Sequence, residues 1–353
     1  MNVKKMITCL LATLGLTTAC GQHNYENADV KRFSELAGNP GVVLLDVRTA
    51  EEFAEGHIEG ALNIDQKQND FTALVGKAIP TDKTLAIYCR SGRRSANAAE
   101  KLAAMGYKCV NLLGGIIAWK DAGKQVTTDT HEVDVVKTKS GKTVKLHALV
   151  HSSIRIEYEG KEIEIDPVTK LGNRTIDYAA MPKADYIFVT HEHQDHFDKA
   201  ALAVLSDGET KLVTNQRCAE MLGYGQVMAN GDALKLADDI TVEAIPAYNT
   251  TEGHLQFHSK GRDNGYIITI DGLRIYVAGD TEDIPEMATL KDIDIAFLPC
   301  NQPFTMTPDQ LLRAAKTIKP GILFPYHYGQ TDVSQIPSQL KEFGIDVRIR
   351  HYE

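Results

Sequence analysis

The chain has 353 residues, of which 43% are hydrophobic and 24% are charged, a composition that excludes collagen, low-complexity disorder and a polytopic membrane protein. Domains usually contain about 100 to 200 residues, so this length predicts two. The formal net charge of −9 disfavours binding to nucleic acid, because no excess of positive charge attracts phosphate. The six cysteines form no CxxC pair, so neither a zinc ribbon nor a disulfide scaffold is indicated.

Residues 1–20 have the order of an export signal. Lys4 and Lys5 precede an apolar run, which is too short to span a bilayer comfortably and is followed by small residues and Cys20. A cysteine in this place resembles the acylation site of a bacterial lipoprotein, although the usual Leu is one place too early, at Leu16. We expect an exported, periplasmic or cell-envelope lipoprotein that touches the membrane only through Cys20; the alternative is simple cleavage near Ala19.

Residues 27–124 are predicted to form an α/β domain that carries a reactive thiol. Asn27 is expected to cap a first short helix. Further on, an apolar strand over 85–88 delivers Cys89 at its carboxyl end, and a tight loop and a strong helix-forming segment follow. Inward N–H groups of the loop, the helix dipole and three arginines within five positions all favour thiolate over thiol. Cys89 is therefore predicted to be a nucleophile.

This stretch, together with Asp46-Val47-Arg48, Gly56-His57-Ile58 and Gly114-Gly115-Ile116, closely resembles a single-domain rhodanese. The resemblance implies that Cys89 accepts a sulfane sulfur from a small-molecule donor as a persulfide and passes it to a small-molecule acceptor. It also implies that the loop cradles the transferred group, through Arg90, Ser91, Gly92, Arg93, Arg94 and Ser95. A phosphatase of the related type needs an Arg six places after the Cys, where this chain has Ser95. The smaller ring that this loop forms around the thiol fits sulfur better than phosphate.

A polar segment over 125–143 reads as a linker, and residues 144–353 as a second, layered α/β domain. The helix expected over 308–318 has Thr307 as its cap. A buried strand over 186–190 feeds His191-Glu192-His193-Gln194-Asp195-His196. Three imidazoles and a carboxylate within six residues are typical of a site for zinc or a similar divalent ion.

The cluster, with Gly279-Asp280-Thr281 and His327 further on, resembles the metallo-β-lactamase superfamily, in its ascorbate-phosphate-lactonase-like branch of metal-dependent hydrolases. The resemblance implies that His191 and His193 belong to one metal site and Asp195 and His196 to a second. It further implies that Asp280 bridges the sites and that His327 completes the second. The expected cofactor is zinc, as one or two divalent ions, with manganese or iron as alternatives. Asp195 is also a candidate proton acceptor, and candidates for holding an oxyanion are Tyr248, Tyr326 and His151.

One departure from the superfamily pattern concerns the first metal site. Members usually carry another His after the strand that reads 242–247 here, but Tyr248-Asn249 follows it. Either Asn249 replaces that ligand or His254 or His258 folds back, and the sequence leaves these alternatives open. Occupancy by a single metal ion is one consequence to test.

The predicted fold class is therefore α/β, a rhodanese-like α/β domain followed by an αββα metallo-β-lactamase-fold sandwich. The favoured function is an exported bifunctional enzyme, a sulfurtransferase joined to a metal-dependent hydrolase of a small-molecule substrate. One alternative is a persulfide dioxygenase-like oxidoreductase with one iron, which the domain order and the unplaced imidazole oppose. Another is a sulfur-binding module whose metal domain is not catalytic. A nuclease is disfavoured by the charge and by the short segment between His196 and Asp280.

Overall fold

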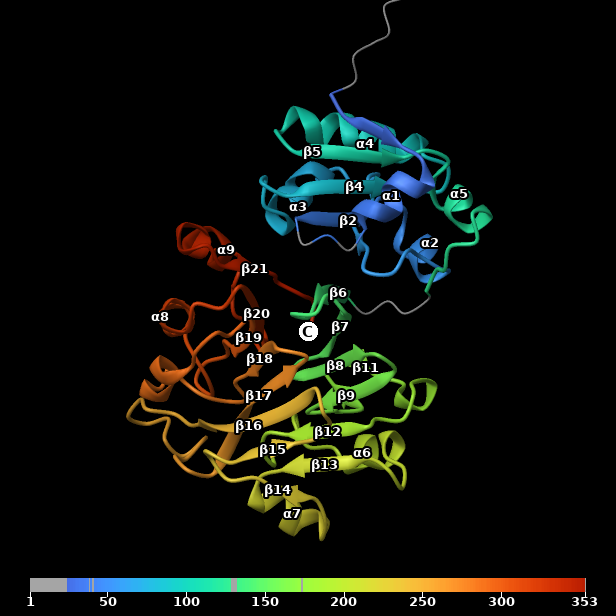
Figure 1. The fold of residues 1–353 in the computed structure, drawn as a ribbon. Helices are drawn as coiled ribbons and strands as arrows, with labels where there is room; N and C mark the ends of the chain where they lie inside the picture. The colour runs from blue at the N-terminus through green and yellow to red at the C-terminus, as the bar shows by residue number, and fades with distance from the viewer. Residues whose placement is uncertain (1–23, 38, 40, 128–131, 173, 353) are drawn as a thin grey trace, which may run out of the picture.

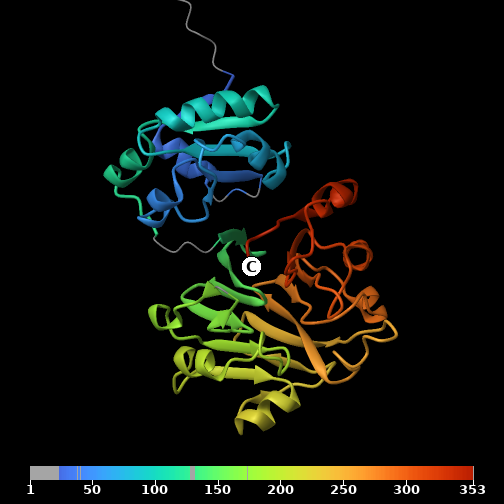
Figure 2. The same cartoon turned by 180° about the vertical axis from the view of Figure 1, so that it is seen from behind.

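The computed structural model describes residues 24–352 apart from residues 38, 40, 128–131 and 173. The expected export signal and Cys20 lie outside the described residues. The chain forms two bodies, one from the blue and teal part of the chain and one from the green to red part (Figures 1 and 2). Within the described ranges, no helix combines the length and the apolar character needed to cross a membrane.

The first body is a five-stranded parallel sheet in the order β1-β5-β4-β2-β3. Side chains alternate across the central strands: Leu85 and Ile87 enter one hydrophobic core, and Ala86 and Tyr88 the core on the other face. Because both faces are covered, these strands read as continuous apolar runs. The elements are β1 (Glu26–Ala28), α1 (Val30–Leu36), β2 (Val42–Asp46), α2 (Ala50–Ala54), β3 (Leu62–Asn63), α3 (Phe71–Ala78), β4 (Thr84–Tyr88), α4 (Arg93–Ala104), β5 (Lys108–Leu112) and α5 (Gly115–Asp121).

The expectation that Asn27 caps the first helix is wrong. Asn27 lies in β1, where it pairs with Asn111 of β5, and the cap is Asp29, whose carboxylate accepts a hydrogen bond from Arg32 N at 2.8 Å. Both residue types are good caps. Strand pairing with β5, more than 80 residues further along the chain, draws Asn27 into the sheet and leaves Asp29 as the cap. Such distant pairing cannot be read from the local sequence.

The second body is a four-layered αββα sandwich built on two seven-stranded sheets. The first sheet has the order β14-β13-β12-β9-β8-β7-β6, and the second runs in chain order from β15 to β21. One apolar core lies between the sheets. A second joins the β15–β21 sheet to α8 and α9, and a third joins the other sheet to α6 and α7. This confirms the predicted fold class.

The strands of the first sheet are β6 (Glu132–Lys137), β7 (Thr143–Val150), β8 (Ser153–Tyr158), β9 (Lys161–Ile165), β12 (Tyr186–Val189), β13 (Lys211–Thr214) and β14 (Gln226–Val227). Those of the second are β15 (Ala233–Lys235), β16 (Ile240–Ala247), β17 (Asp263–Ile270), β18 (Leu273–Val277), β19 (Ile295–Pro299), β20 (Ile322–Tyr326) and β21 (Asp346–Val347). The α-helices are α6 (Lys199–Leu205), α7 (Gln216–Leu222), α8 (Pro308–Ile318) and α9 (Ile336–Leu340). A small hairpin joins β10 (Lys170–Leu171) to β11 (Arg174–Thr175).

Two details concern the elements predicted for the second domain. The helix over 308–318 is present as α8, and its capping box consists of Thr307 and Gln310. In contrast, β6 falls inside the segment expected to be a linker and pairs with β7 along six residues. The strand is an edge strand with charges among its apolar residues, so its sequence resembles a polar connection.

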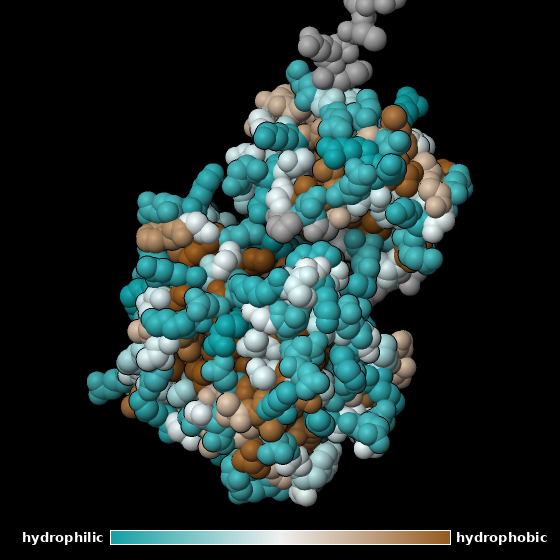
Figure 3. Space-filling model, in the orientation of Figure 1, coloured by the Kyte–Doolittle hydropathy of each residue, from teal (hydrophilic) through white to brown (hydrophobic). Residues whose placement is uncertain are grey.

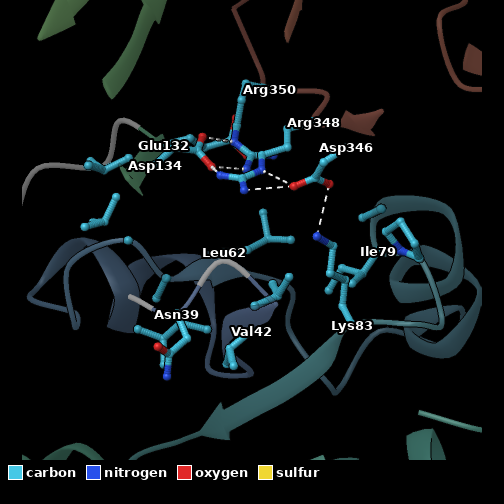
Figure 4. Close-up of a pocket in the computed structure, with 18 of the residues that line it drawn as sticks. Asn39, Val42, Leu62, Ile79, Lys83, Glu132, Asp134, Asp346, Arg348 and Arg350 are labelled. Carbon is cyan, nitrogen blue, oxygen red and sulfur yellow. Dashed lines mark hydrogen bonds and ion pairs between the residues drawn. The ribbon is translucent and has the colours of Figure 1, made fainter. Parts of the chain in front are cut away.

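The two domains touch through ion pairs, and residues of both line a small cavity of about 120 Å³ (Figure 4). The Glu59 carboxylate lies 2.7 Å from Lys145 Nζ, and Lys83 Nζ lies 3.1 Å from the Asp346 carboxylate. The first domain lines the cavity with apolar residues, among them Val42, Leu62 and Ile79.

A buried ion network forms the opposite wall of this cavity (Figure 4). Asp134 of β6 accepts hydrogen bonds from Arg348 Nη1 and Arg350 Nη2, both at 2.7 Å. Burial opposes ionisation of this carboxyl, but the two guanidinium groups hold the pKa of Asp134 below its ordinary value. Arg348 also bonds Asp346, the partner of Lys83. The network therefore links β6 and the segment after β21 to the first domain.

Hydrophilic side chains cover most of the face shown in Figure 3, with hydrophobic residues scattered among them. Exposed large apolar residues such as Met221 and Tyr224 are few among the described residues. Scattered apolar side chains are normal on a protein surface and need no partner.

We predict that Asp134→Asn lowers the free energy of unfolding of the second domain by about 3 kcal/mol, because the partly buried guanidinium of Arg350 loses its bonded carboxylate and that of Arg348 keeps only Asp346. Trp119 is the single tryptophan and lies in the first domain, so its fluorescence separates the two transitions in a urea titration monitored in parallel by circular dichroism. Lys83→Ala, which breaks a more exposed pair, should cost about 1 kcal/mol or less. Equal losses for the two variants would contradict the assignment.

Candidate functional site

The candidate metal-binding side chains come from strand ends and turns of the second domain. Residues 191–196 follow β12, Asp280 follows β18 and His327 follows β20. His151 lies at the turn between β7 and β8, and His258 lies in the loop between β16 and β17. Strand ends at one edge of the sandwich thus gather residues that are far apart in sequence.

The first cluster consists of His191, His193, His258 and Asp280, whose donor atoms all lie within 4.8 Å of one another. Nε2 of His191 is 3.1 Å from Nδ1 of His193, and Nε2 of His258 is 3.3 Å from Oδ2 of Asp280. Three imidazoles and one carboxylate are a donor set for a tetrahedral divalent ion.

Of the two histidines left open for this site, the structure places only His258 in the cluster. The Nδ2 of Asn249 donates to the carbonyl oxygens of Phe304 and His254. His254 faces the Glu282 carboxylate at 3.3 Å. The imidazole that the sequence analysis could not place is therefore present in space, supplied from a later point in the chain.

The second cluster consists of His151, Asp195, His196 and His327. Oδ2 of Asp195 lies 3.2 Å from His151 Nε2 and 3.4 Å from His327 Nε2. The rings of His151 and His327 lie with their centroids 3.7 Å apart and their planes tilted by 44°. The sequence prediction joined Asp195, His196 and His327 in one site, and the structure brings them together with His151 added.

Asp280 stands between the two clusters. Its Oδ1 lies 3.2 Å from His196 Nε2 and 3.4 Å from His327 Nε2. Its Oδ2 faces the other way, toward His258 and His191. One carboxylate with one oxygen toward each cluster is the arrangement expected of a bridging ligand between two cations.

Unpartnered buried atoms test whether these residues fit metal ions. Nε2 of His196, Nε2 of His327 and Oδ1 of Asp280 are buried and form no hydrogen bond, although both nitrogens lie within 3.4 Å of that oxygen. Buried polar atoms without a partner are costly in a protein interior. Lone pairs that converge in this way are stabilised by a cation, so the residues present fit the metal.

The protonation states of the ligand imidazoles fall into two groups. Burial holds the pKa of His191 well below its ordinary value, and burial likewise lowers the pKa of His193 and of His327. These three imidazoles are therefore neutral, which is the form that binds metal.

His196 and His258 form the other group. Burial opposes their protonation, but the carboxylates beside them raise the pKa of His196 well above its ordinary value and that of His258 to about 9. A metal ion bound by these rings would displace their protons. Burial opposes ionisation of Asp280, yet the charged imidazole of His196 holds the pKa of this carboxyl well below the usual range.

Asp195 is ionised for a similar reason. Burial opposes its ionisation, but His196, His151 and His327 around it lower the pKa of its carboxyl. A carboxylate that holds its charge so firmly is better suited to ligating a cation than to accepting a proton.

Outer partners orient the ligand rings, and the sequence analysis did not assign them. Nδ1 of His258 lies 3.1 Å from Oδ2 of Asp263, and Nδ1 of His196 lies 2.8 Å from Oδ2 of Asp166. Such carboxylate–imidazole pairs fix the ring so that Nε2 faces the metal. Asp166 precedes Pro167 in the loop after β9, whereas Asp263 follows His258 by five residues and could have been found from that spacing.

Two candidates for holding an oxyanion do not face the clusters. The Tyr248 hydroxyl donates to Glu286 and accepts from Lys260. Tyr326 is buried in the core between the sheets, where it packs edge to face against Phe297 and Tyr352.

In the first domain, Cys89 directly follows β4 and its thiol lies inside the following loop. Gly92 N–H donates to Sγ at 3.2 Å and Ser95 O–H at 3.4 Å. Burial raises the pKa of Cys109 to about 12 and that of Cys300 to about 12. Those thiols are therefore inert, whereas Sγ of Cys89 lies beside the first turn of α4, where the helix dipole stabilises negative charge.

The three loop arginines have different surroundings. Arg94 makes two hydrogen bonds of 2.6 Å to Glu52, which lower the pKa of that carboxyl to about 2. Arg90 and Arg93 are exposed. Arg94 therefore braces the loop, and Arg90 and Arg93 are left at its surface. Cys89 itself is fully buried.

The start of α5 closes the loop from the other side. Ile116 N–H donates to Cys89 O at 2.8 Å, and Ile117 N–H donates to Arg90 O at 3.2 Å. Gly115, with φ +60°, fits against this turn so tightly that a Cβ there would lie 2.3 Å from Cys89 O. The Gly114-Gly115 pair recognised in the sequence is therefore a contact surface for the thiol loop.

Two clusters around a shared carboxylate, on an αββα sandwich, define a metal-dependent hydrolase. Residues 145–327, just over half of the chain, match the beta-lactamase superfamily domain, and residues 29–122 match the rhodanese-like domain. The chain belongs to the UPF0173 metal-dependent hydrolases of the beta-lactamase superfamily, with a rhodanese-like domain in front.

The relatives of known sequence and structure agree with this assignment. A UPF0173 metal-dependent hydrolase from Geobacillus thermodenitrificans is 33% identical over 201 residues, which cover 54% of this chain and 88% of that protein. One from Thermococcus kodakarensis is 29% identical over 215 residues, covering 56% and 91%. The crystal structure of a protein from Parabacteroides distasonis named as a metal-dependent hydrolase is 48% identical, with a TM-score of 0.61, and covers 63% of this chain and 100% of that one.

We predict that Gly115→Ala destabilises the first domain by about 3 kcal/mol, because it combines a left-handed backbone with a severe overlap against Cys89 O. The measurement is urea unfolding followed by Trp119 fluorescence. Gly123→Ala is the matched control: Gly123 also has a positive φ, of +72°, but nothing lies within 4 Å of its Cβ position, so about 1 kcal/mol is expected. A loss for Gly115→Ala no larger than the control's would refute the close contact.

Proposed function

We propose that this protein is an exported bifunctional enzyme, in which the second domain hydrolyses a small molecule with two divalent metal ions and the first domain transfers sulfane sulfur through Cys89. The observation that carries the hydrolase part is Asp280, which presents one carboxylate oxygen to each of two imidazole clusters. Zinc is the proposed cofactor, with manganese or iron as alternatives at either position.

For the hydrolase, the chain supplies a dry, pre-oriented donor set. His191 and His193 present neutral imidazoles, and Asp166 and Asp263 hold the rings of His196 and His258 in place. Divalent ions held there would lower the pKa of a water molecule and polarise a carbonyl or phosphoryl oxygen of the substrate. Two carboxylates, those of the buried Asp280 and the partly exposed Asp195, balance the positive charge. We propose hydrolysis at neutral pH of an ester, lactone or phosphodiester.

For sulfur transfer, the proposed steps begin at Sγ of Cys89. The thiolate attacks the outer sulfur of thiosulfate, a sulfur–sulfur bond forms and sulfite leaves with the electron pair of the broken bond. A second thiolate or cyanide then takes the outer sulfur and returns the electron pair to Sγ. The Gly92 N–H and the Ser95 hydroxyl stabilise the thiolate in each resting state. Arg90 and Arg93 attract the anionic donor.

We also propose export with lipid attachment at Cys20. The support is the order of charged, apolar and small residues in the first 20 positions.

The structure changes the argument against the alternative function, a single-iron persulfide dioxygenase. The unplaced imidazole counted against it in the sequence, and His258 now fills that position in space. The second cluster, with three imidazoles of its own, favours a two-ion hydrolase. Oxygen uptake with glutathione persulfide, together with one iron per chain, would establish the alternative and overturn the hydrolase proposal.

We predict that His258→Ala loses about one equivalent of bound metal and at least about 100-fold of hydrolytic rate, because a direct ligand is worth more than the outer partners, whose removal costs about 10 to 100-fold. Metal is measured by elemental analysis, and rates with bis-p-nitrophenyl phosphate and a γ-lactone. His254→Ala, which removes the neighbouring imidazole outside the cluster, should keep both metal and rate. Loss of metal from His254→Ala instead would show that the loop is arranged differently.

We predict that Cys89→Ser reduces sulfur transfer from thiosulfate to cyanide by at least about 1000-fold, because the nucleophile is removed. Metal content and hydrolysis should be unchanged. Cys109→Ser, at a protonated thiol in the same domain, should transfer sulfur at the normal rate. Transfer retained by Cys89→Ser would refute the assignment of the nucleophile.

A further inference from the structure

His151 occupies a place in the second cluster that no pattern of the sequence assigned to it. It is 5% exposed. Its Nε2 lies 3.2 Å from Asp195 Oδ2, and the centroid of its ring lies 3.7 Å from that of His327. Its donor atom falls within the same 4.8 Å as those of Asp195, His196 and His327.

The backbone fixes His151 in this position. Its N–H donates to Tyr352 O at 2.8 Å, and its carbonyl accepts from His327 N–H at 3.2 Å. Both His151, with φ +54°, and His327, with φ +48°, are in the left-handed region, which is strained for residues other than glycine. Strain held at two adjacent imidazoles is typical of residues whose direction matters to a site.

Counting donors shows that the two clusters are unequal. The first has three imidazoles and shares Asp280, which makes four donors. With His151, the second has three imidazoles, Asp195 and the other oxygen of Asp280, which makes five. Without His151, the second would also have four.

We propose that His151 is a protein ligand of the second metal ion, and that the two positions therefore hold ions of different coordination number. This inference rests on the proposed two-ion centre. Four donors suit tetrahedral zinc. Five donors, two of them carboxylates, suit an ion that accepts six ligands and tolerates mixed oxygen and nitrogen donors, such as Mn²⁺ or Fe²⁺. The centre is then a mixed one, with zinc in the first position.

The competing role for His151 is that of a positioning residue, which would only hydrogen-bond Asp195 and orient it. Both roles bring Nε2 close to the carboxylate. They differ in the number of imidazoles bound to the metal, which is three if His151 is a ligand and two if it is not.

The experiment counts imidazoles directly. Metal-depleted full-length protein receives one equivalent of Zn²⁺ and one of Mn²⁺, and pulsed electron paramagnetic resonance of the manganese, with ¹⁵N-labelled histidine, gives the number of coordinated rings. We expect three in the unmodified protein and three in His258→Ala, whose first cluster is damaged. In that variant the second cluster offers only His196 and His327 besides His151, so a count of three requires His151 as a ligand. His151→Ala should give two.

Outcomes that overturn the inference are equally defined. A count of two in the unmodified protein makes His151 a positioning residue. A count that falls in His258→Ala and not in His151→Ala places manganese in the first cluster and refutes the assignment of the ions. The number of histidine rings bound to manganese in His258→Ala decides between the two roles of His151 even if His151→Ala does not fold.

Affinity gives an independent readout. His151→Ala should weaken Mn²⁺ binding by more than about 100-fold, which exceeds the effect of an outer partner. Ser152→Ala is the matched control, because its hydroxyl donates to Asp195 O at 2.9 Å and so supports the same loop without reaching the metal. It should weaken binding by less than about 100-fold, and equal effects would refute the ligand role. Failure of both ions to bind the unmodified protein would instead refute the proposed two-ion centre itself.

Discussion

The site of the second domain depends on one constraint. Imidazole nitrogens and carboxylate oxygens converge in two clusters with little contact with water, and their lone pairs repel one another unless a cation lies between them. Asp280 is central to it, because its two oxygens face different clusters from a single side chain. Its own position comes from the end of β18, next to the parallel strands β19 and β20. The order of strands in one sheet therefore determines the separation of two metal positions.

Much of this arrangement could be predicted from the sequence, because the informative residues are close together in the chain. His191, His193, Asp195 and His196 lie in one loop after a strand, and Cys89 lies in another. His258 and His151 could not be assigned in the same way. Each comes from a loop whose path depends on distant pairing: Asn249 N–H binds His258 O, and His151 N–H binds Tyr352 O. The position of β6 was missed for a related reason, since an edge strand with charged residues has the composition of a linker.

The first domain surrounds the Sγ of Cys89 in a different way. No metal ligand set surrounds Cys89 among the residues that the structure describes. Its environment is made of backbone N–H groups, a helix end and the tight approach of Gly115. The two sites thus stabilise negative charge in opposite ways, one by cations and the other by oriented peptide dipoles. Each site is built entirely from side chains of its own domain.

The hydrogen bond between His151 and Tyr352 places part of the support of the metal site far from the ligands in sequence. Tyr352 is 1% exposed, and its ring packs edge to face against Tyr326 in the core between the sheets. A change in that core that shifts the backbone at Tyr352 would therefore release the imidazole of His151 from its strained conformation. Such a packing defect, remote from every ligand, would be read as altered metal loading.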